Sequence, residues 1–465
     1  MHRTDTPEAA AHRPAPGAWH ARAPLRRPRA PLRSDLEVDV AIVGGGFSGL
    51  WTAYHLLQGD PSLRVVVLER DVIGFGASGR NGGWLMGAAP ADLQVWERKF
   101  GLDAARRAQG VLVDAVSEIA DVIARDELGL PPRLAGSITI ARSAAEEQRL
   151  HARRAADEHY GWPADGHAWL EPDEVRERIG ATGVRGALES RPCGTLDPVR
   201  LITKLAARVE ALGGTVHERS PVVSVEPRLL RTDSATVRAP RIVMATEAFT
   251  VEQPGEGRRY LPLASTIVST APIPDGARDE IGWRGGEAVG DAHHLFFYAQ
   301  ITREGRLTLG GRGAPYRLGS AVEHAGIADR ATTDRLEATI ADVWPALAGV
   351  PIESRWSGSI AVPRDWCASC GVDADSGVAW IGGYGGHGVA ATYVLARSLA
   401  PLLRGEPDPL GPLPWTLHRP RRWEPEPIRW MMSQAIVRTL GSADRLEAAG
   451  KPARRMKLVE RFIAG

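Results

Sequence analysis

The pattern of apolar and polar positions is clearest near the start of the chain. Residues 38–43 form a short apolar run, which predicts a buried strand, and residues 50, 51, 54 and 57 lie on one face of a helix after it. A second apolar run covers residues 65–69. This order of strand, helix and strand predicts a β-α-β unit of ordinary length.

The spacing of apolar residues changes several times after this unit. Apolar residues recur at helical spacing from Leu102 to about Leu128, and residues 135–190 mix short strand and helix signals. Asp197-Pro198 predicts the start of a helix, with Asp as N-cap and Pro in the first turn, and Gly213-Gly214 predicts its end. Strand-like runs at 222–225 and 241–245 then restore an α/β pattern.

Residues 260–312 alternate like a β-sheet, with strands expected at 265–268, 295–298 and 307–309. Residues 378–381 predict one more strand, which a glycine-rich turn joins to a helix at about 390–403. We therefore expect an α/β protein in which an α+β domain, built on a mostly antiparallel sheet, interrupts the first domain.

The expected division of the chain follows these changes. The first domain comprises 34–100, 190–255 and 355–405, and the inserted domain comprises 101–189 and 256–354. Residues 1–33 are rich in proline and arginine without a hydrophobic period, which favours a disordered arm or one draped over the surface. Residues 406–465 form a basic tail, whose tryptophans we expect to pack on the protein while its arginines face water.

Composition limits the possible partners. The chain of 465 residues has a formal net charge of +1, which gives no electrostatic reason to expect nucleic acid or an anionic membrane. No apolar run approaches the length of a transmembrane helix. Three cysteines are too few for a disulfide framework and fit a reducing compartment, so we expect a cytoplasmic protein with a small-molecule partner.

The turn Gly44-Gly45-Gly46-Phe47-Ser48-Gly49 lies between the first strand and the first helix. Its spacing matches G-x-G-x-x-G: Gly44 permits a tight turn, Gly46 allows a pyrophosphate to approach, and Gly49 lets helix and strand pack closely. Glu69 ends the second strand, where an acid can accept hydrogen bonds from ribose hydroxyls. The motif predicts a bound dinucleotide and does not separate FAD from NAD.

Two further glycine-rich segments narrow this prediction. They are Gly74-Phe75-Gly76-Ala77-Ser78-Gly79-Arg80-Asn81-Gly82-Gly83 and Gly382-Gly383-Tyr384-Gly385-Gly386-His387-Gly388. With the opening turn, they resemble the D-amino-acid oxidase superfamily of flavoproteins, most closely the gamma-glutamylputrescine oxidase type. The resemblance covers about residues 36–405 and implies a glutathione-reductase-like FAD-binding domain with an interleaved substrate domain.

The same resemblance implies a set of contacts with FAD in addition to Gly44, Gly46, Gly49 and Glu69. The second glycine segment would pass along the pyrophosphate and flavin, Val223 would meet the adenine, and the third glycine segment would hold the pyrimidine edge of the flavin. The residues implied are Arg70, Ser78, Arg80, Asn81, Gly83, Val223, Ala245, Thr246, Gly385, Gly386 and Gly388.

We expect FAD to be bound noncovalently and no metal to be present. A cysteine tethers the flavin in sarcosine-oxidase relatives, but the sequence around Cys367 and Cys370 does not match that pattern. Their C-x-x-C spacing is also compatible with a redox pair or half a zinc site, although no second pair of ligands is evident. We favour two ordinary thiols.

Members of this superfamily typically oxidise a carbon that bears an amine, passing hydride to the flavin and electrons to oxygen. Relatives that act on α-amino acids hold the substrate carboxylate with an arginine two residues after a glycine of a late strand, where this chain has Ile360 after Gly358. We therefore expect an amine or N-substituted amine as substrate, unless Arg312, Arg355 or Arg364 supplies the guanidinium instead.

Two side chains are candidates for a direct part in the reaction. His387 lies in the third glycine segment, and Tyr298 lies in the sheet expected above the flavin, although an ordinary core role is an alternative for Tyr298. Two other readings of the whole chain stay open at this point. One is a flavin dehydrogenase that oxidises an amino acid and passes electrons to a quinone or carrier protein, and the other is a non-catalytic FAD-binding subunit.

Overall fold

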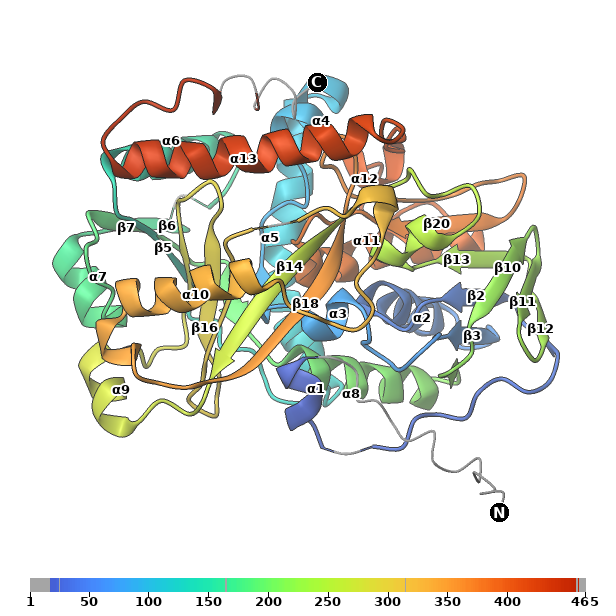
Figure 1. Cartoon of the computed structure of the whole chain (residues 1–465). Helices are drawn as coiled ribbons and strands as arrows, with labels where there is room; N and C mark the ends of the chain where they lie inside the picture. Colours follow the sequence, from blue (N-terminus) through green and yellow to red (C-terminus); the bar gives the residue numbers. More distant parts are fainter. Residues whose placement is uncertain (1–16, 25, 164, 314, 457–458, 460–465) are drawn as a thin grey trace, which may run out of the picture.

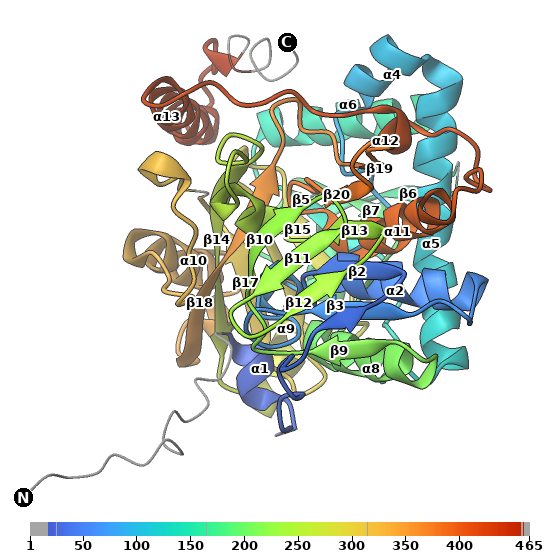
Figure 2. The same ribbon diagram turned by 90° about the vertical axis from the view of Figure 1, so that its right-hand side faces the viewer.

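The computed structural model describes residues 17–24, 26–163, 165–313, 315–456 and 459. Two large sheets lie side by side, one at the right and one at the left of Figure 1, with the short helix α3 (Ala77–Arg80) between them. Figure 2 views the same arrangement from the side of the right-hand sheet. The junction between the sheets is where the glycine-rich segments meet.

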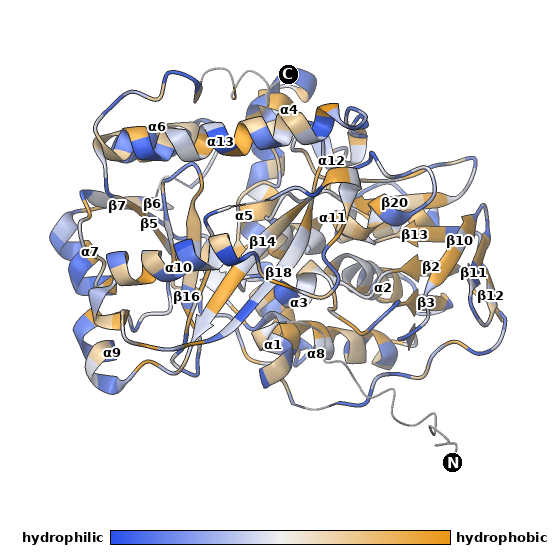
Figure 3. Cartoon of the chain, in the orientation of Figure 1, coloured by the Kyte–Doolittle hydropathy of each residue, from blue (hydrophilic) through white to orange (hydrophobic). Residues whose placement is uncertain are grey.

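The right-hand sheet, which we call the dinucleotide domain sheet, has six strands in the order β19-β20-β13-β2-β3-β9. All neighbouring strands are parallel except β19, which pairs antiparallel with β20 at one edge. Figure 3 shows its central strands as mainly hydrophobic, as expected of strands buried on both faces. The bounds are β2 Val40–Val43, β3 Val65–Leu68, β9 Thr215–His217, β13 Arg241–Met244, β19 Ser369–Val372 and β20 Val378–Gly382.

Four long helices share one hydrophobic core with this sheet, and two shorter helices add Val95, Trp96 and Trp415 to it. The long helices are α2 (Phe47–Gly59), α5 (Leu102–Arg125), α8 (Pro198–Ala211) and α11 (Gly388–Arg404). The start predicted for α8 is confirmed, because the Asp197 side chain accepts the N–H groups of Val199 and Arg200. The place of α5 differs from our division of the chain: its buried face packs beside α11, so this helix belongs with the dinucleotide domain.

The left-hand sheet, which we call the substrate domain sheet, has eight strands in the order β18-β14-β17-β16-β15-β5-β7-β6. Only β15 and β5 are parallel neighbours, which confirms a mostly antiparallel sheet. The bounds are β5 Ser137–Ala141, β6 His167–Leu170, β7 Gly186–Ser190, β14 Leu261–Thr270, β15 Ala288–Asp291, β16 Phe297–Ile301, β17 Leu307–Gly311 and β18 Ile352–Val362.

One boundary lies elsewhere than the sequence pattern indicated. We placed the return to the first domain at residue 355, but β18 pairs with β14 from Ile352 to Val362. The return therefore follows Val362. The helices of the substrate domain are α6 (Ala144–His159), α7 (Pro172–Ile179), α9 (Asp275–Ile281) and α10 (Arg330–Val343).

Smaller elements complete the two domains. A four-stranded sheet has the order β1-β12-β11-β10, and β4 pairs with β8. Their bounds are β1 Leu36–Glu37, β4 Trp84–Met86, β8 Cys193–Thr195, β10 Val222–Glu226, β11 Leu229–Thr232 and β12 Thr236–Arg238, with α4 at Leu93–Phe100 and short 3-10 helices η2 at Glu247–Glu252, η3 at Leu318–Ser320 and η4 at Pro345–Leu347.

Both ends of the chain lie against these domains. Residues 17–33 carry the helix α1 (Ala18–Arg22) and contact both domains; the remainder of the predicted arm lies outside the described residues. The tail forms α12 (Pro414–Leu417) and α13 (Ile428–Ala448), which crosses the top of Figure 1. Trp415 and Trp423 are buried as expected, whereas Trp430 is 37% exposed. Within the described residues, no helix has the length and apolar character needed to cross a membrane.

Candidate functional site

The first glycine turn leaves no room for side chains at two of its three motif positions. Gly44 has φ +112°, and a Cβ there would lie 2.6 Å from the Ala245 carbonyl oxygen. A Cβ on Gly49 would lie 2.0 Å from the Gly44 carbonyl oxygen, so the glycine allows α2 to sit directly against the turn. The structure thus gives the steric reasons that the motif predicts for these two glycines.

Helix α2 begins at this turn without a side-chain cap from its own N-cap residue, Gly46. The Phe47 N–H is donated to the Ser78 hydroxyl oxygen at 2.9 Å, and a Cβ on Gly46 would lie 3.0 Å from that oxygen. Ser78 of the second glycine segment therefore reaches the helix N-terminus. The free N–H groups and positive dipole end of such a helix suit a pyrophosphate.

Glu69 lies at the same turn. One carboxylate oxygen accepts the Gly45 N–H at 2.8 Å, and the other accepts the Asp71 N–H at 2.9 Å. Burial raises the pKa of Glu69 to about 7, against the effect of these two N–H donors. A hydroxyl donor such as a ribose would supply a third hydrogen bond in this place. The glycine cradle, the helix N-terminus and this acid together fit FAD.

The end of the second glycine segment is held by donors from four other parts of the chain. The carbonyl oxygens of residues 80–83 accept, in order, Trp356 Nε1 at 2.9 Å, Trp19 Nε1 at 2.8 Å, Gln300 Nε2 at 2.6 Å and the Leu196 N–H at 2.8 Å. Asn81 holds the segment from inside, since its amide donates to Ala77 and Ser78 and accepts the Gly83 N–H. The backbone path expected along the flavin is therefore held by contacts within the protein.

The two arginines predicted at the FAD site use their guanidinium groups within the protein. Arg80 is 2% exposed and donates to the carbonyl oxygens of Phe75, Glu323, Ser357 and His324. Desolvation lowers its pKa to about 10. Arg70 pairs with Asp71 and Glu252 and lies over the Phe249 ring. Both guanidinium groups therefore have partners within the protein, and the contacts of Arg70 and Arg80 with FAD stay a prediction.

Three other predicted contacts come from the strands around the turn. Ala245 follows β13 and donates its N–H to the Val43 carbonyl oxygen at 2.9 Å, which places Ala245 and Thr246 against Gly44. The Thr246 hydroxyl is bonded to the Thr250 hydroxyl at 2.7 Å. Val223 is 55% exposed on β10, in the separate four-stranded sheet. Its contact with adenine stays a prediction.

The third glycine segment joins β20 to the N-terminus of α11. Gly385 and Gly386 have φ values of +58° and +105°, and Gly388 is the first residue of the helix. A Cβ on Gly386 would lie 3.8 Å from Ile360 Cδ1. This segment therefore faces β18 of the substrate domain sheet, and the side chain nearest Gly386 is the isoleucine that replaces the expected arginine.

Glu247 is a residue near this segment that sequence reasoning missed. It follows Thr246 with φ +46°, and its carboxylate accepts the Gly383 N–H at 2.9 Å. Burial raises the pKa of Glu247 to about 7, and burial together with the Glu247 charge raises the pKa of Tyr260 beside it. The sequence signal that could have identified it is an acidic residue two positions after the strand predicted at 241–245.

Tyr298 and His387, the two candidates for a direct part in the reaction, lie on opposite sides of the junction between the two domains. The Tyr298 ring covers Gly82, where a Cβ would lie 2.5 Å from it, and its hydroxyl is 2.8 Å from Ser265 Oγ. Burial raises the pKa of Tyr298 to about 12, so this hydroxyl stays protonated. His387 is the N-cap residue of α11 and is exposed, and its part in the reaction stays a prediction.

The three arginines considered as substitutes at the carboxylate position are engaged elsewhere. Arg312 pairs with buried Asp291 at 2.5 Å and also bonds Thr339. Arg355 pairs with Glu337 at 2.7 Å, and Arg364 pairs with Glu424 at 3.1 Å. Each guanidinium thus has an intramolecular partner.

The three cysteines of the chain, all within the described residues, are buried and free. Cys367 donates its thiol to the Asp365 carbonyl oxygen, and Cys370 donates its thiol to the Leu395 carbonyl oxygen. Burial raises the pKa of both thiols, which keeps them in the unreactive protonated form.

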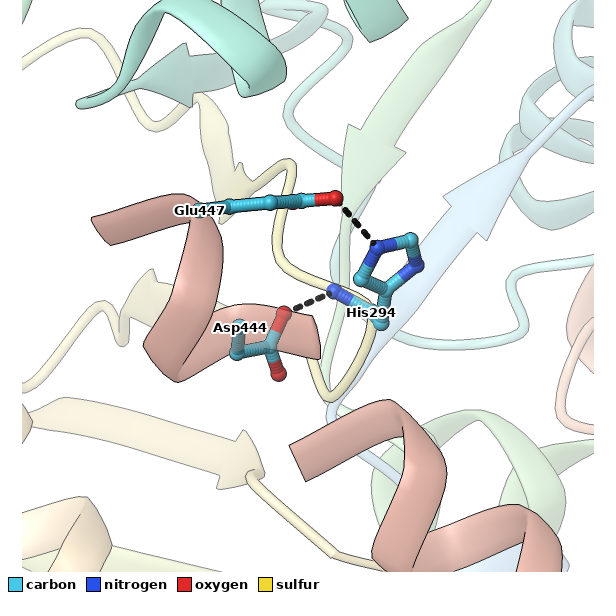
Figure 4. A group of neighbouring side chains, drawn as sticks. All are labelled: His294, Asp444 and Glu447. Carbon is cyan, nitrogen blue, oxygen red and sulfur yellow. Dashed lines mark hydrogen bonds and ion pairs between the residues drawn. The ribbon is translucent and has the colours of Figure 1, made fainter. Parts of the chain in front are cut away.

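Among the described residues, His294, Asp444 and Glu447 have the spacing of a potential metal site (Figure 4). Each of the three side chains already has partners within the protein. Asp444 accepts the N–H groups of His294 and Leu295, and Glu447 pairs with the His294 ring at 3.1 Å and with Arg149 at 2.5 Å. We interpret the group as an ion-pair network that fastens α13 to the β15–β16 connection.

Comparison with known proteins agrees with this geometry. The profile of the family described as "FAD dependent oxidoreductase" (DAO) matches residues 39–402. Gamma-glutamylputrescine oxidoreductase of Escherichia coli strain K12 is 30% identical over 384 residues, which are 81% of this chain and 86% of that protein. A probable oxidoreductase, OrdL, of Rhizobium meliloti is 27% identical over 84% of this chain and 89% of its own length.

Solved structures give the same fold. The crystal structure of glycine oxidase from Geobacillus kaustophilus aligns with a TM-score of 0.68 at 18% identity, and the alignment covers 83% of this chain and 99% of that chain. The match of the family profile extends from before β2 to within α11 and includes all three glycine segments. This chain is therefore a member of the DAO family of FAD-dependent oxidoreductases.

Proposed function

We propose that this enzyme oxidises the CH–NH bond of an amine or N-substituted amine, with noncovalent FAD accepting hydride and molecular oxygen as the final electron acceptor. The observation that carries the choice of substrate is Ile360, which approaches the Gly386 backbone from the substrate domain sheet. An apolar side chain there gives a substrate carboxylate no bidentate partner.

The contacts of the neighbouring arginines support the same choice. Arg312, Arg355 and Arg364 would each have to leave an ion pair before binding a carboxylate, and the Arg312 pair with Asp291 is buried. Separating a buried pair leaves an uncompensated charge, which costs about 3–5 kcal/mol. A free α-amino acid is thus a poorer candidate than an amine without an adjacent carboxylate.

The residues at the junction have tasks that suit a neutral amine. Tyr298 supplies an aromatic wall and a protonated hydroxyl, and Ile360 places an apolar side chain beside Gly386. His387 is exposed at the N-terminus of α11, beside Gly386, where we propose that it meets the substrate.

The name of one relative suggests a class of substrate. The Escherichia coli relative is named for gamma-glutamylputrescine, an N-acylated diamine. We accordingly propose a polyamine or a polyamine derivative as the first class to test. A cytoplasmic location, which rests on the cysteine content, is part of the same proposal.

The test is an anaerobic screen in which absorbance of the oxidised flavin is followed after addition of polyamines, acylated polyamines, N-methylated amino acids and free amino acids. We expect bleaching by a polyamine-type compound and no bleaching by glycine or alanine. Bleaching by free amino acids alone would contradict the substrate class, and no bleaching by any compound would favour a non-catalytic FAD-binding subunit.

The electron acceptor is tested separately by admitting air to the reduced enzyme. Rapid return of the flavin absorbance with one hydrogen peroxide per substrate oxidised is the expected result. Slow reoxidation in air, together with fast reoxidation by a soluble quinone, would identify a dehydrogenase instead.

A further inference from the structure

We propose that residues 17–33 form a strap that holds the second glycine segment, Gly74 to Gly83, in its FAD-binding conformation, with Trp19 and His20 as positioning residues. The match of the family profile starts at residue 39, so the strap is additional to the matched part of the chain. The described part of the strap comprises residues 17–24 and 26–33.

Trp19 holds the end of the glycine segment. Its side chain is 4% exposed and packs in one small core with Val199, Ile267 and Trp356. Its indole N–H is donated to the Asn81 carbonyl oxygen at 2.8 Å. A tryptophan satisfies its only polar atom in this way, and the bond fixes the direction of the peptide between Asn81 and Gly82.

His20 holds the beginning of the same segment. Its Nε2 lies 3.1 Å from the Gly74 carbonyl oxygen. A Cβ on Gly79 would lie only 2.4 Å from this nitrogen, so the glycine at 79 is what allows the ring to approach. Burial lowers the pKa of His20, which keeps the ring neutral at pH 7 with one N–H for Gly74.

A third contact acts immediately before Gly74. Arg26 makes two hydrogen bonds to Glu218, at 2.6 and 2.5 Å, and the Glu218 side chain is 0% exposed. The same carboxylate accepts the N–H groups of Ile73 and Arg29, each at 2.6 Å. One buried acid therefore joins the strap to the residue that precedes the glycine segment.

These contacts hold both ends of the segment, while Ser78 between them reaches the N-terminus of α2. The strap also reaches the substrate domain, where Arg22 donates to Ser269 Oγ at 3.2 Å. A segment held in its bound conformation loses less conformational entropy when a cofactor binds. The strap thus acts on FAD affinity through the glycine segment, so the proposal is independent of the identity of the amine.

The test measures the rate of FAD release from diluted holoenzyme, followed by the gain of free-flavin fluorescence. Trp19→Phe keeps most of the ring packing and removes the N–H, and His20→Ala removes the bond to Gly74. We expect each variant to release FAD about five- to tenfold faster, as the loss of one buried hydrogen bond implies.

Arg29→Ala is the matched control in the same strap. Its side chain pairs with Glu210 on α8 at 2.7 Å, away from the glycine segment, so its FAD release should equal that of the parent. Thermal unfolding of each apoprotein measures any purely structural effect.

The proposal is overturned if Trp19→Phe and His20→Ala release FAD at the parental rate, or if Arg29→Ala accelerates release as much as they do. If one of the two variants does not fold, the other decides. A variant that folds, by circular dichroism, but is purified without flavin supports the proposal.

Discussion

At the scale of single residues, Glu247 combines a left-handed backbone conformation with a buried carboxylate. Its backbone has φ +46°, and its side chain accepts the N–H of Gly383 at the start of the third glycine segment. Left-handed backbone in a residue other than glycine costs about 1 kcal/mol or more and persists where the surroundings impose it. The carboxyl therefore ties the end of β13 to the segment expected at the flavin.

This position makes the stability of the apoprotein depend on pH. The folded-state pKa of Glu247 is about 7, above its ordinary value of 4.5, so the folded protein binds more protons than the unfolded chain between these two values. The stabilising contribution is complete below pH 4.5 and is lost as the pH rises through 7. Glu247→Gln should flatten the urea-unfolding free energy between pH 5 and 8 relative to the parent.

The pKa of Glu69 is also raised to about 7, but Glu69 is present in both the parent and Glu247→Gln. The difference between their two curves of unfolding free energy against pH therefore reports on Glu247 alone. Parallel curves for variant and parent over this range would mean that Glu247 is ionised at pH 5 in the folded protein.

Ile360 carries a prediction about specificity. Its Cδ1 is the atom nearest a Cβ built on Gly386, so Ile360→Arg places a guanidinium beside the expected flavin edge. We expect kcat/KM for the best amine to fall at least about tenfold and the ratio of amino-acid to amine activity to rise. Ile360→Leu, which conserves volume, should leave that ratio unchanged. Equal ratios in the arginine variant and the parent would place the substrate away from Ile360.

At the scale of elements, the contact between α2 and β2 depends on one missing side chain. A Cβ on Gly49 would overlap the Gly44 carbonyl oxygen, so Gly49→Ala must push the helix from the turn. We expect a loss of about 1–3 kcal/mol in unfolding free energy, as for overpacked cores, together with a lower flavin content after purification. Urea unfolding and the ratio of flavin to protein absorbance measure the two effects.

Gly110 provides the control for this substitution. It lies within α5, and a Cβ there would meet nothing within 4 Å. Gly110→Ala should therefore stabilise the protein by about 0.5–1 kcal/mol through the helix propensity of alanine. If both substitutions destabilised equally, the close contact at Gly49 would not be the cause.

The elements also show how far the sequence could be interpreted. The first β-α-β unit and the start of α8 could be predicted because burial on both faces and an Asp-Pro cap are local properties. The membership of β18 and α5 could not, since an apolar face does not specify which neighbouring core will cover it. The residue Glu247 escaped for a related reason: its function depends on the distant Gly383.

The residues of the candidate site likewise fall into those that local sequence predicts and those that depend on tertiary contacts. Gly44, Gly46, Gly49 and Glu69 were predictable because the spacing of one motif places them at a single turn. For Arg70 and Arg80 the sequence indicates a polar side chain near the cofactor, but it does not show their partners from other segments, such as Glu252 and His324. Trp19 and His20 lie in a segment without periodicity, and only the tertiary structure brings them to Asn81 and Gly74.

At the scale of the whole molecule, the junction between the two domains is centred on Arg80. Its guanidinium donates to backbone carbonyl oxygens of Phe75 on one side and of Glu323, His324 and Ser357 on the other. A planar fork with several donors can serve such a set, whereas the single ammonium of lysine cannot.

Arg80→Lys should therefore loosen the junction. Buried carbonyl oxygens left without donors cost about 1–3 kcal/mol, so we expect a fall of that size in the free energy of unfolding and faster release of FAD. Arg64→Lys is the control, because the pair of Arg64 with Asp39 is exposed and such pairs contribute about 0–1 kcal/mol. Loss of FAD at the parental rate in Arg80→Lys, despite lower stability, would show that the glycine segment keeps its conformation without this junction. In that case the strap and the internal bonds of Asn81 would be sufficient to hold it.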